Sequence, residues 1–199
     1  MSVSISKGNR KLGGIPSFSV PPVATCSHCS ECSKKCYALK MSRLYPSVGK
    51  AWQGNLDEWR TNPQAVKYAI INTAITSGYF RYFVGGDIVD ADFFAMMVEI
   101  AGLIPSCRFL AFTKKHEIVN AYIDSHGNLP NNLQVIFSGW GEGLQPCNPH
   151  NLPESDVIFK GQEPPKNALI CGGNCVDCLC RGVSCWALKK GEKIHFYEH

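Results

Sequence analysis

Strand-like and helix-like segments alternate through the middle of this chain, and this alternation is the feature that most constrains its fold. Short segments rich in aromatic and β-branched residues have the composition of strands at 80–86, 107–115 and 133–140. Segments with apolar residues at helical spacing lie before or between them at 62–78, 90–105 and 116–127. Strands that alternate with helices at this spacing predict βαβ units and a mostly parallel sheet.

Shorter candidate strands extend the pattern on both sides, at 16–20, 156–160, 167–170 and 193–199. We therefore expect an α/β fold whose sheet is open or forms an incomplete β/α barrel. The chain shows neither an internal repeat nor a low-complexity linker, so residues 1–199 are expected to form a single domain. A chain of 199 residues can bury one sizeable core, so it does not need disulfides to fold.

Polar residues follow the three central strands at the point where each strand is expected to end. Folds of this class place their chemistry at the carboxyl ends of the strands. The candidate cofactor-binding residues there are Gly85, Gly86, Asp87, Lys114 and Ser138. A plainer interpretation is also open, in which the two glycines form only a strand-end turn and the lysine lies at a solvated helix entry.

Two segments hold nine of the eleven cysteines. The N-terminal cysteine segment (22–40) contains CSHCSECSKKC, and the C-terminal cysteine segment (171–186) contains CGGNCVDCLCRGVSC. The first residues show no apolar run typical of a signal peptide, and we expect a cytoplasmic protein. In a reducing compartment clustered thiols are more often metal ligands or catalytic groups than disulfides. Cys107 and Cys147 lie outside the two segments and are expected to be bystanders.

The cysteine spacing favours iron–sulfur clusters over single metal ions. The first segment runs C-x2-C-x2-C-x3-C, a compact spacing used around a [4Fe–4S] cluster, whereas structural zinc sites more often use two separated pairs. The predicted metal ligands are Cys26, Cys29, Cys32, Cys36, Cys171, Cys175, Cys178 and Cys185. The second segment has one cysteine too many, so its fourth ligand is either Cys171 or Cys180. The alternative to iron–sulfur clusters is that one or both segments bind structural zinc, which would fix them in place.

The charge pattern points to neither nucleic acid nor membrane. The net charge of +4 is mild, and the lysines and arginines occur in small groups instead of one stripe. No stretch reaches the roughly 20 apolar residues of a membrane span.

Several segments, in this order, resemble one known family. They are GGIPSFSVPP, a cysteine cluster ending in CYALK, RLYPSVGKAWQGNLDEW, RYFVGGDIVDADFFAMMVEIA, FLAFTKKHE and a closing cysteine cluster ending in CW. Together they resemble the phage-encoded gene product 88 domain over nearly the whole chain. The resemblance implies a bacteriophage protein in the cytoplasm of the host cell. It also implies iron–sulfur clusters and a core similar to a shortened radical S-adenosylmethionine domain.

The resemblance also implies roles for individual residues. Cys26, Cys32 and Cys36 match the family's cysteines, and Cys29 is additional. A radical S-adenosylmethionine enzyme holds its cluster with three cysteines and leaves one iron open for the cofactor, so a fourth ligand at Cys29 would close that iron. The turn from Gly85 to Asp87 is similar to the Gly-Gly-Glu motif that binds the methionyl amine.

We therefore expect an iron–sulfur protein with one or two [4Fe–4S] clusters, similar to a radical S-adenosylmethionine enzyme and served by an electron donor such as a ferredoxin or flavodoxin. The alternatives are a non-catalytic cluster protein for electron transfer or host-partner binding, and a zinc-stabilised binding module.

Overall fold

A seven-stranded parallel sheet forms the centre of the protein. The computed structural model describes residues 3–27, 32–182 and 184–198. The strands are β1 (Ser17–Phe18), β2 (Tyr79–Tyr82), β3 (Arg108–Thr113), β4 (Leu133–Ser138), β5 (Glu154–Ile158), β6 (Leu169–Ile170) and β7 (Lys193–Tyr197). Their order is β1-β2-β3-β4-β5-β7-β6, and every neighbouring pair is parallel. The predicted α/β class and parallel sheet are thus confirmed, and the sheet is open.

The helices begin and end at residues that explain their bounds. They are α2 (Tyr37–Leu44), α3 (Pro46–Thr61), α4 (Pro63–Ala74), α5 (Ala91–Leu103), α6 (His116–His126) and α7 (Cys175–Cys180), with short 3-10 helices η1 (Ser33–Lys35) and η2 (Cys185–Ala187). The side chains of Asn62 and Asp90 accept backbone hydrogen bonds at the starts of α4 and α5. Gly127, with a φ of 85°, follows the last residue of α6. No helix in these ranges has the length and apolar character that a membrane span requires.

The central strand predicted at 80–86 is shorter in the structure. It ends at Tyr82, because Phe83 has a φ of 58° and turns the chain out of the sheet. The last strands are not in chain order within the sheet, since β7 lies between β5 and β6.

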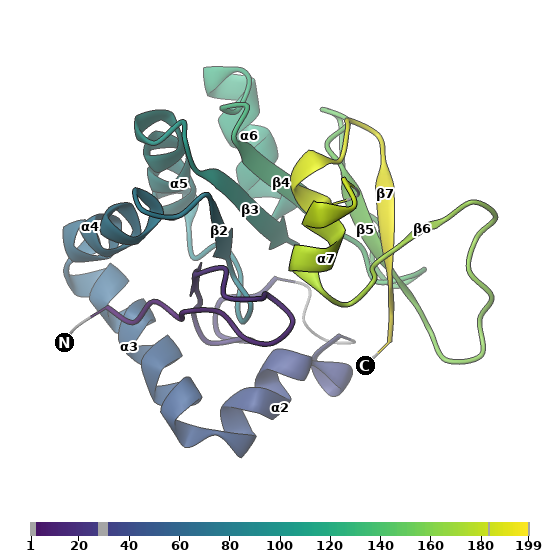
Figure 1. Ribbon diagram of the computed structural model, residues 1–199, viewed down its shortest axis with the longest axis horizontal. Helices are drawn as coiled ribbons and strands as arrows, with labels where there is room; N and C mark the ends of the chain where they lie inside the picture. Colours follow the sequence, from purple (N-terminus) through teal and green to yellow (C-terminus); the bar gives the residue numbers. More distant parts are fainter. Residues whose placement is uncertain (1–2, 28–31, 183, 199) are drawn as a thin grey trace.

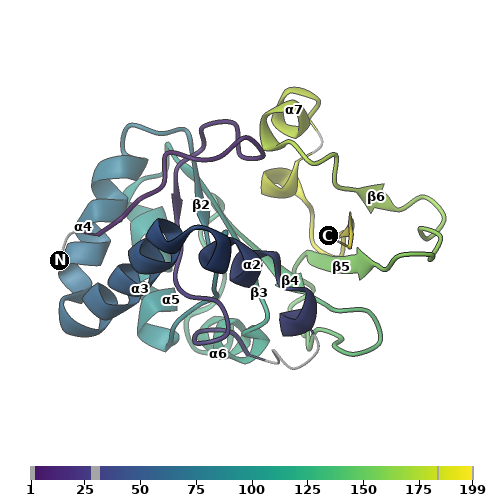
Figure 2. The same cartoon turned by 90° about the horizontal axis from the view of Figure 1, so that it is seen from below.

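The two faces of the sheet carry separate apolar cores. One face packs against α3, α4, α5 and α6 through alternate strand residues such as Phe80, Tyr82 and Phe109. The opposite face packs against the C-terminal cysteine segment, where Leu110 and Ile136 contact a cluster that includes Trp186. Figures 1 and 2 show α7 apart from α3 to α6, across the strands. The C-terminal cysteine segment is therefore a covering layer of the sheet.

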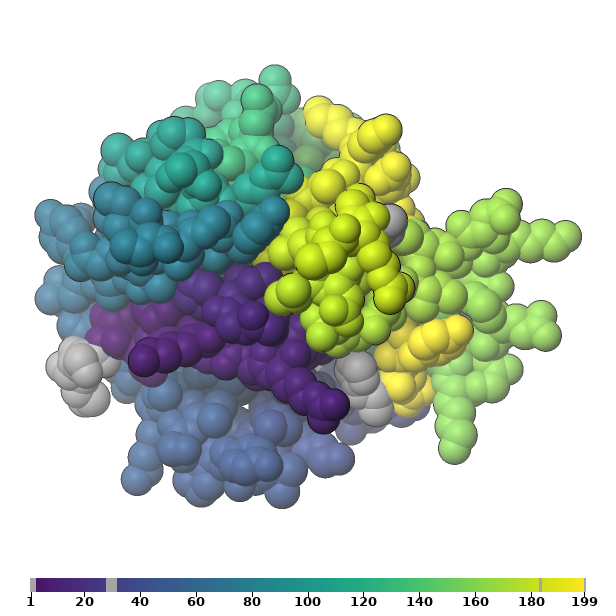
Figure 3. Space-filling view, viewed as in Figure 1, coloured from purple at the N-terminus to yellow at the C-terminus, as the bar shows by residue number. Residues whose placement is uncertain are grey.

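The N-terminal residues complete this second layer. The backbone N–H of Cys175 donates to the carbonyl of Lys11 at 2.9 Å, and Gly13 lies so close to Val176 that a Cβ atom would approach its methyl carbon to 2.2 Å. Figure 3 shows the two ends of the chain in contact on this face, in purple and yellow-green. The cysteines of the C-terminal segment are thereby fixed against the sheet.

Candidate functional site

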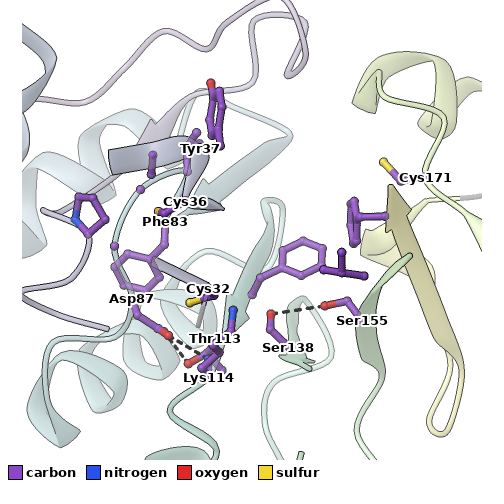
Figure 4. A pocket seen from close by; sticks show the side chains of 18 of the residues that line it. Cys32, Cys36, Tyr37, Phe83, Asp87, Thr113, Lys114, Ser138, Ser155 and Cys171 are labelled. Carbon is purple, nitrogen blue, oxygen red and sulfur yellow. Dashed lines mark hydrogen bonds between the residues drawn. The ribbon is translucent and has the colours of Figure 1, made fainter. Parts of the chain in front are cut away.

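Both cysteine segments line one cavity at the carboxyl edge of the sheet. The cavity has a volume of about 340 Å³. The cysteines on its wall are Cys26, Cys32, Cys36, Cys171, Cys175 and Cys185. Figure 4 shows Cys32 and Cys36 on one side and Cys171 on the other, with the ends of the central strands between them. Segments near opposite ends of the chain thus meet in one space.

The predicted cofactor-binding residues are brought to the same cavity. Gly85, Gly86, Asp87, Lys114 and Ser138 all line it. They follow β2 and β3 or, in the case of Ser138, end β4, and these three strands are neighbours in the sheet. Their convergence follows from the parallel arrangement, since parallel strands end at a common edge.

The turn after β2 is tightly packed. A Cβ atom on Gly85 would lie 2.5 Å from the ring of Trp52 on α3. Gly86 has a φ of 79°, and a Cβ atom there would lie 2.5 Å from the carbonyl oxygen of Val20. The carbonyl of Gly85 accepts a hydrogen bond from the N–H of Val20 at 3.1 Å. The two glycines are therefore required by the close approach of neighbouring chain segments.

Asp87 is buried and hydrogen-bonded within the protein. Its Oδ1 accepts from the Thr113 hydroxyl at 2.6 Å and from the N–H of Ile88 at 2.8 Å, and its Oδ2 accepts from the N–H of Lys114 at 2.8 Å. Burial raises the pKa of this carboxyl above its ordinary value, while the three hydrogen bonds act in the opposite direction. The acid thus joins the loops that follow β2 and β3.

The same turn positions the start of the N-terminal cysteine segment. The Thr25 hydroxyl accepts from the N–H of Asp87 at 3.1 Å and donates to the carbonyl of Pro21 at 2.8 Å. Thr25 precedes Cys26, so this pair of bonds holds the first cysteine beside the turn. Cys36 caps the start of α2, and its sulfur accepts from the N–H of Leu39 at 3.4 Å. Cys29, the fourth predicted ligand, lies outside the described residues.

The C-terminal cysteines form a compact group. Cys171, Cys178 and Arg81 all act on the protonation of Cys175 and Cys185, which places these side chains within electrostatic range of one another. Burial raises the pKa of Cys175 and raises that of Cys185 to about 12. Cys180 is exposed, and neither Cys178 nor Cys180 lines the cavity. Of the two candidates for the fourth ligand, Cys171 is the one that lines the cavity and lies within electrostatic range of Cys175 and Cys185.

No group of three or more histidine, cysteine, aspartate or glutamate side chains in the described part of the chain is arranged to hold a single metal ion. The predicted metal-binding character of the two segments consequently remains a prediction.

Arg81 is a cavity residue that the sequence prediction missed. It lies on β2 between Phe80 and Tyr82, and side chains alternate along a strand, so it points to the face opposite the helices. Its side chain lies within electrostatic range of Cys175 on the cavity wall, and its guanidinium lies 4.7 Å from the centre of the Phe112 ring. The sequence signal that could have identified Arg81 is a charged residue within the otherwise aromatic segment FRYF.

Further charged residues of both signs line the cavity and come from several elements. Lys114 lies over the Trp140 ring, with its Nζ 5.8 Å from the ring centre. Lys35, on η1, forms an ion pair with Glu198, which follows β7, so the N-terminal cysteine segment is tied to the last strand. Lys11 and Asp156 also lie on the cavity wall.

The fold and the cavity define an open parallel α/β protein with a cysteine-lined site at the carboxyl edge of its sheet. The chain belongs to the phage family Gene product 88, whose model matches residues 3–193. Comparisons with curated proteins and with solved structures gave no match. The family predicted from the sequence is thus confirmed, whereas its iron–sulfur character is not tested by the match.

Proposed function

We propose that this phage protein is an iron–sulfur protein that holds a [4Fe–4S] cluster in each cysteine segment. The observation that carries the proposal is the convergence of both segments on one cavity at the carboxyl edge of the sheet. Such clusters supply one-electron transfer. The chain's own contribution is to bring the two thiol groups together, to shield them, and to provide hydrogen bonds and positive charge around them.

The donor atoms around the sulfurs fit this role. The sulfurs of Cys36 and Cys171 accept backbone hydrogen bonds, from Leu39 and Gly173, each at 3.4 Å. Hydrogen bonds to cysteine sulfur stabilise the thiolate form that binds iron and are among the factors that set a cluster's potential. Cys26, Cys32 and Cys36 would hold the first cluster, and Cys171, Cys175, Cys178 and Cys185 the second.

A second candidate function is radical chemistry with S-adenosylmethionine, which the cavity favours by its place and size. The space lies at the carboxyl edge, is bordered by Gly85, Gly86 and Lys114, and faces the N-terminal cysteines. However, both oxygens of Asp87 and the carbonyl of Gly85 already accept hydrogen bonds from the protein. Electron transfer without S-adenosylmethionine, from a ferredoxin or flavodoxin to a further partner, therefore requires fewer changes in this turn.

Metal and sulfide analysis of protein purified without oxygen tests the proposal. We expect about eight iron and eight sulfide per chain for two four-iron clusters. Stoichiometric zinc without acid-labile sulfide would overturn it. Incubation with dithionite and S-adenosylmethionine then separates the two functions, since 5′-deoxyadenosine forms only if the second candidate is correct.

A further inference from the structure

Arg81 is a positively charged residue beside the C-terminal cysteine group. It lines the cavity together with Cys171, Cys175 and Cys185 and lies within electrostatic range of all three. Its guanidinium also lies over the ring of Phe112, which packs edge to face with Phe196 of β7. The sheet and the C-terminal cysteine segment therefore enclose the arginine between an aromatic ring and sulfur atoms.

This guanidinium lacks the partner that a buried cation normally has. The residue keeps some exposure toward the cavity, but its Nε atom is buried and makes no hydrogen bond in the described part of the protein. The ion pairs of the described residues join other groups, and none of them includes Arg81. A cation removed from water is costly unless an opposite charge compensates it. The groups within reach are cysteine sulfurs, which provide that charge only as thiolates.

We propose that Arg81 is the positioning residue that balances the negative charge of a metal–thiolate centre in the C-terminal cysteine segment and thereby raises its reduction potential. This inference rests on the proposed function. Arg81 favours the reduced state because reduction by a low-potential one-electron donor adds one negative charge and breaks no bond. Net charge is one of the factors that set cluster potentials, and Arg81 supplies a positive charge beside the sulfurs. Arginine suits the position because its guanidinium remains charged when buried and stacks on aromatic rings.

The first test is a redox titration of the full-length, cluster-loaded protein, followed by electron paramagnetic resonance with dithionite as reductant. In Arg81→Met we expect one reduction step to move to lower potential by about 60 mV, a tenfold change for one electron. Arg81→Lys keeps the charge and should retain most of the wild-type potential. Arg108→Met is the matched control, since Arg108 is exposed at the start of β3, and neither step should move.

The second test separates a role in charge balance from a purely structural role. In metal-free protein, Arg81→Met removes an uncompensated cation, so we expect an equal or higher melting temperature than wild type. In loaded protein the same substitution should release iron to a chelator about tenfold faster, because the centre loses its counter-charge. A residue needed only for packing would destabilise both forms. Arg81→Gln provides a second neutral variant with the same expected shifts if Arg81→Met does not fold.

The outcomes distinguish this inference from the proposed function. Wild-type protein without iron and sulfide would overturn the proposed function and the inference with it. Loaded wild-type protein whose two potentials are unchanged in Arg81→Met and Arg81→Gln would overturn the inference alone.

Discussion

The Thr113 hydroxyl donates a 2.6 Å hydrogen bond to Oδ1 of Asp87, and this contact joins the loops that follow two neighbouring strands. The same hydroxyl accepts from the N–H of Lys115 at 2.9 Å. Asp87 in turn accepts from the N–H of Lys114. This network of hydrogen bonds thus connects the ends of β2 and β3 at the edge of the cavity.

Removing the hydrogen bond between Thr113 and Asp87 should destabilise the protein without creating a cavity in the core. In Thr113→Val the isosteric side chain keeps its volume but loses the hydroxyl, so a buried carboxylate loses a donor at a cost of about 1–3 kcal/mol. Thr113→Ser keeps the hydroxyl and is the control. Urea unfolding of the metal-free variants measures the difference, and equal stability of the valine and serine variants would show that the bond contributes nothing.

The raised pKa of Asp87 predicts a particular pH dependence of stability. Burial is the main cause of the shift, so the folded protein favours the protonated carboxyl. The stability that this raised pKa of Asp87 contributes is fully present below the unfolded pKa of about 3.9, and it is lost as the pH rises through the folded pKa. The stability difference between metal-free wild type and Asp87→Asn should therefore be largest in acid and decline with rising pH. A difference that grows with pH would contradict this assignment.

The contact between Gly85 and Trp52 predicts opposite effects for two identical substitutions. Gly85→Ala places a methyl group 2.5 Å from the indole and should destabilise by about 1–3 kcal/mol through overpacking. Gly54→Ala, on the same helix as Trp52, meets open space and should gain up to about 1 kcal/mol in helix propensity. Thermal unfolding of both variants measures whether each substitution lowers or raises the melting temperature relative to wild type. A second substitution, Trp52→Leu, should restore part of the stability lost in Gly85→Ala.

The cysteines should differ in their reaction with iodoacetamide. In reduced, metal-free protein at pH 8 the exposed Cys147 and Cys180 should react first. Cys107 and Cys185 should react last, because burial raises the pKa of each to about 12 and little thiolate forms. Mass spectrometry of tryptic peptides gives the order, and unfolding in urea should abolish it. Rapid alkylation of Cys185 in the folded protein would contradict the described burial.

Local signals in the sequence were sufficient for the central part of the fold. The spacing of apolar residues predicts α4, α5 and α6, and the aromatic and β-branched segments predict the three central strands, of which only β2 is clearly shorter than predicted. The gathering of Gly85, Lys114 and Ser138 at one cavity also follows from parallel strands. These features depend on residues near one another in the chain, so they can be read without knowing the tertiary contacts.

The features of the site that were not predicted depend on contacts between residues far apart in the sequence. The C-terminal cysteine segment covers the second face of the sheet, and this cover brings Cys175 beside Arg81. The role of Gly85 likewise depends on the ring of Trp52, which lies on α3. The hydrogen bonds that Asp87 accepts from Thr113 and from two backbone N–H groups also depend on the packing of separate loops.

The most direct measurement of the central claim is the iron content of two triple variants of the full-length chain. One variant replaces Cys26, Cys32 and Cys36 with serine, and the other replaces Cys171, Cys175 and Cys185. With one cluster in each segment, each variant should retain about half of the wild-type iron and sulfide. Cys147→Ser, at the exposed cysteine outside both segments, should retain all of it. Two triple variants that both keep the full wild-type iron content, or a wild type that binds none, would contradict the account.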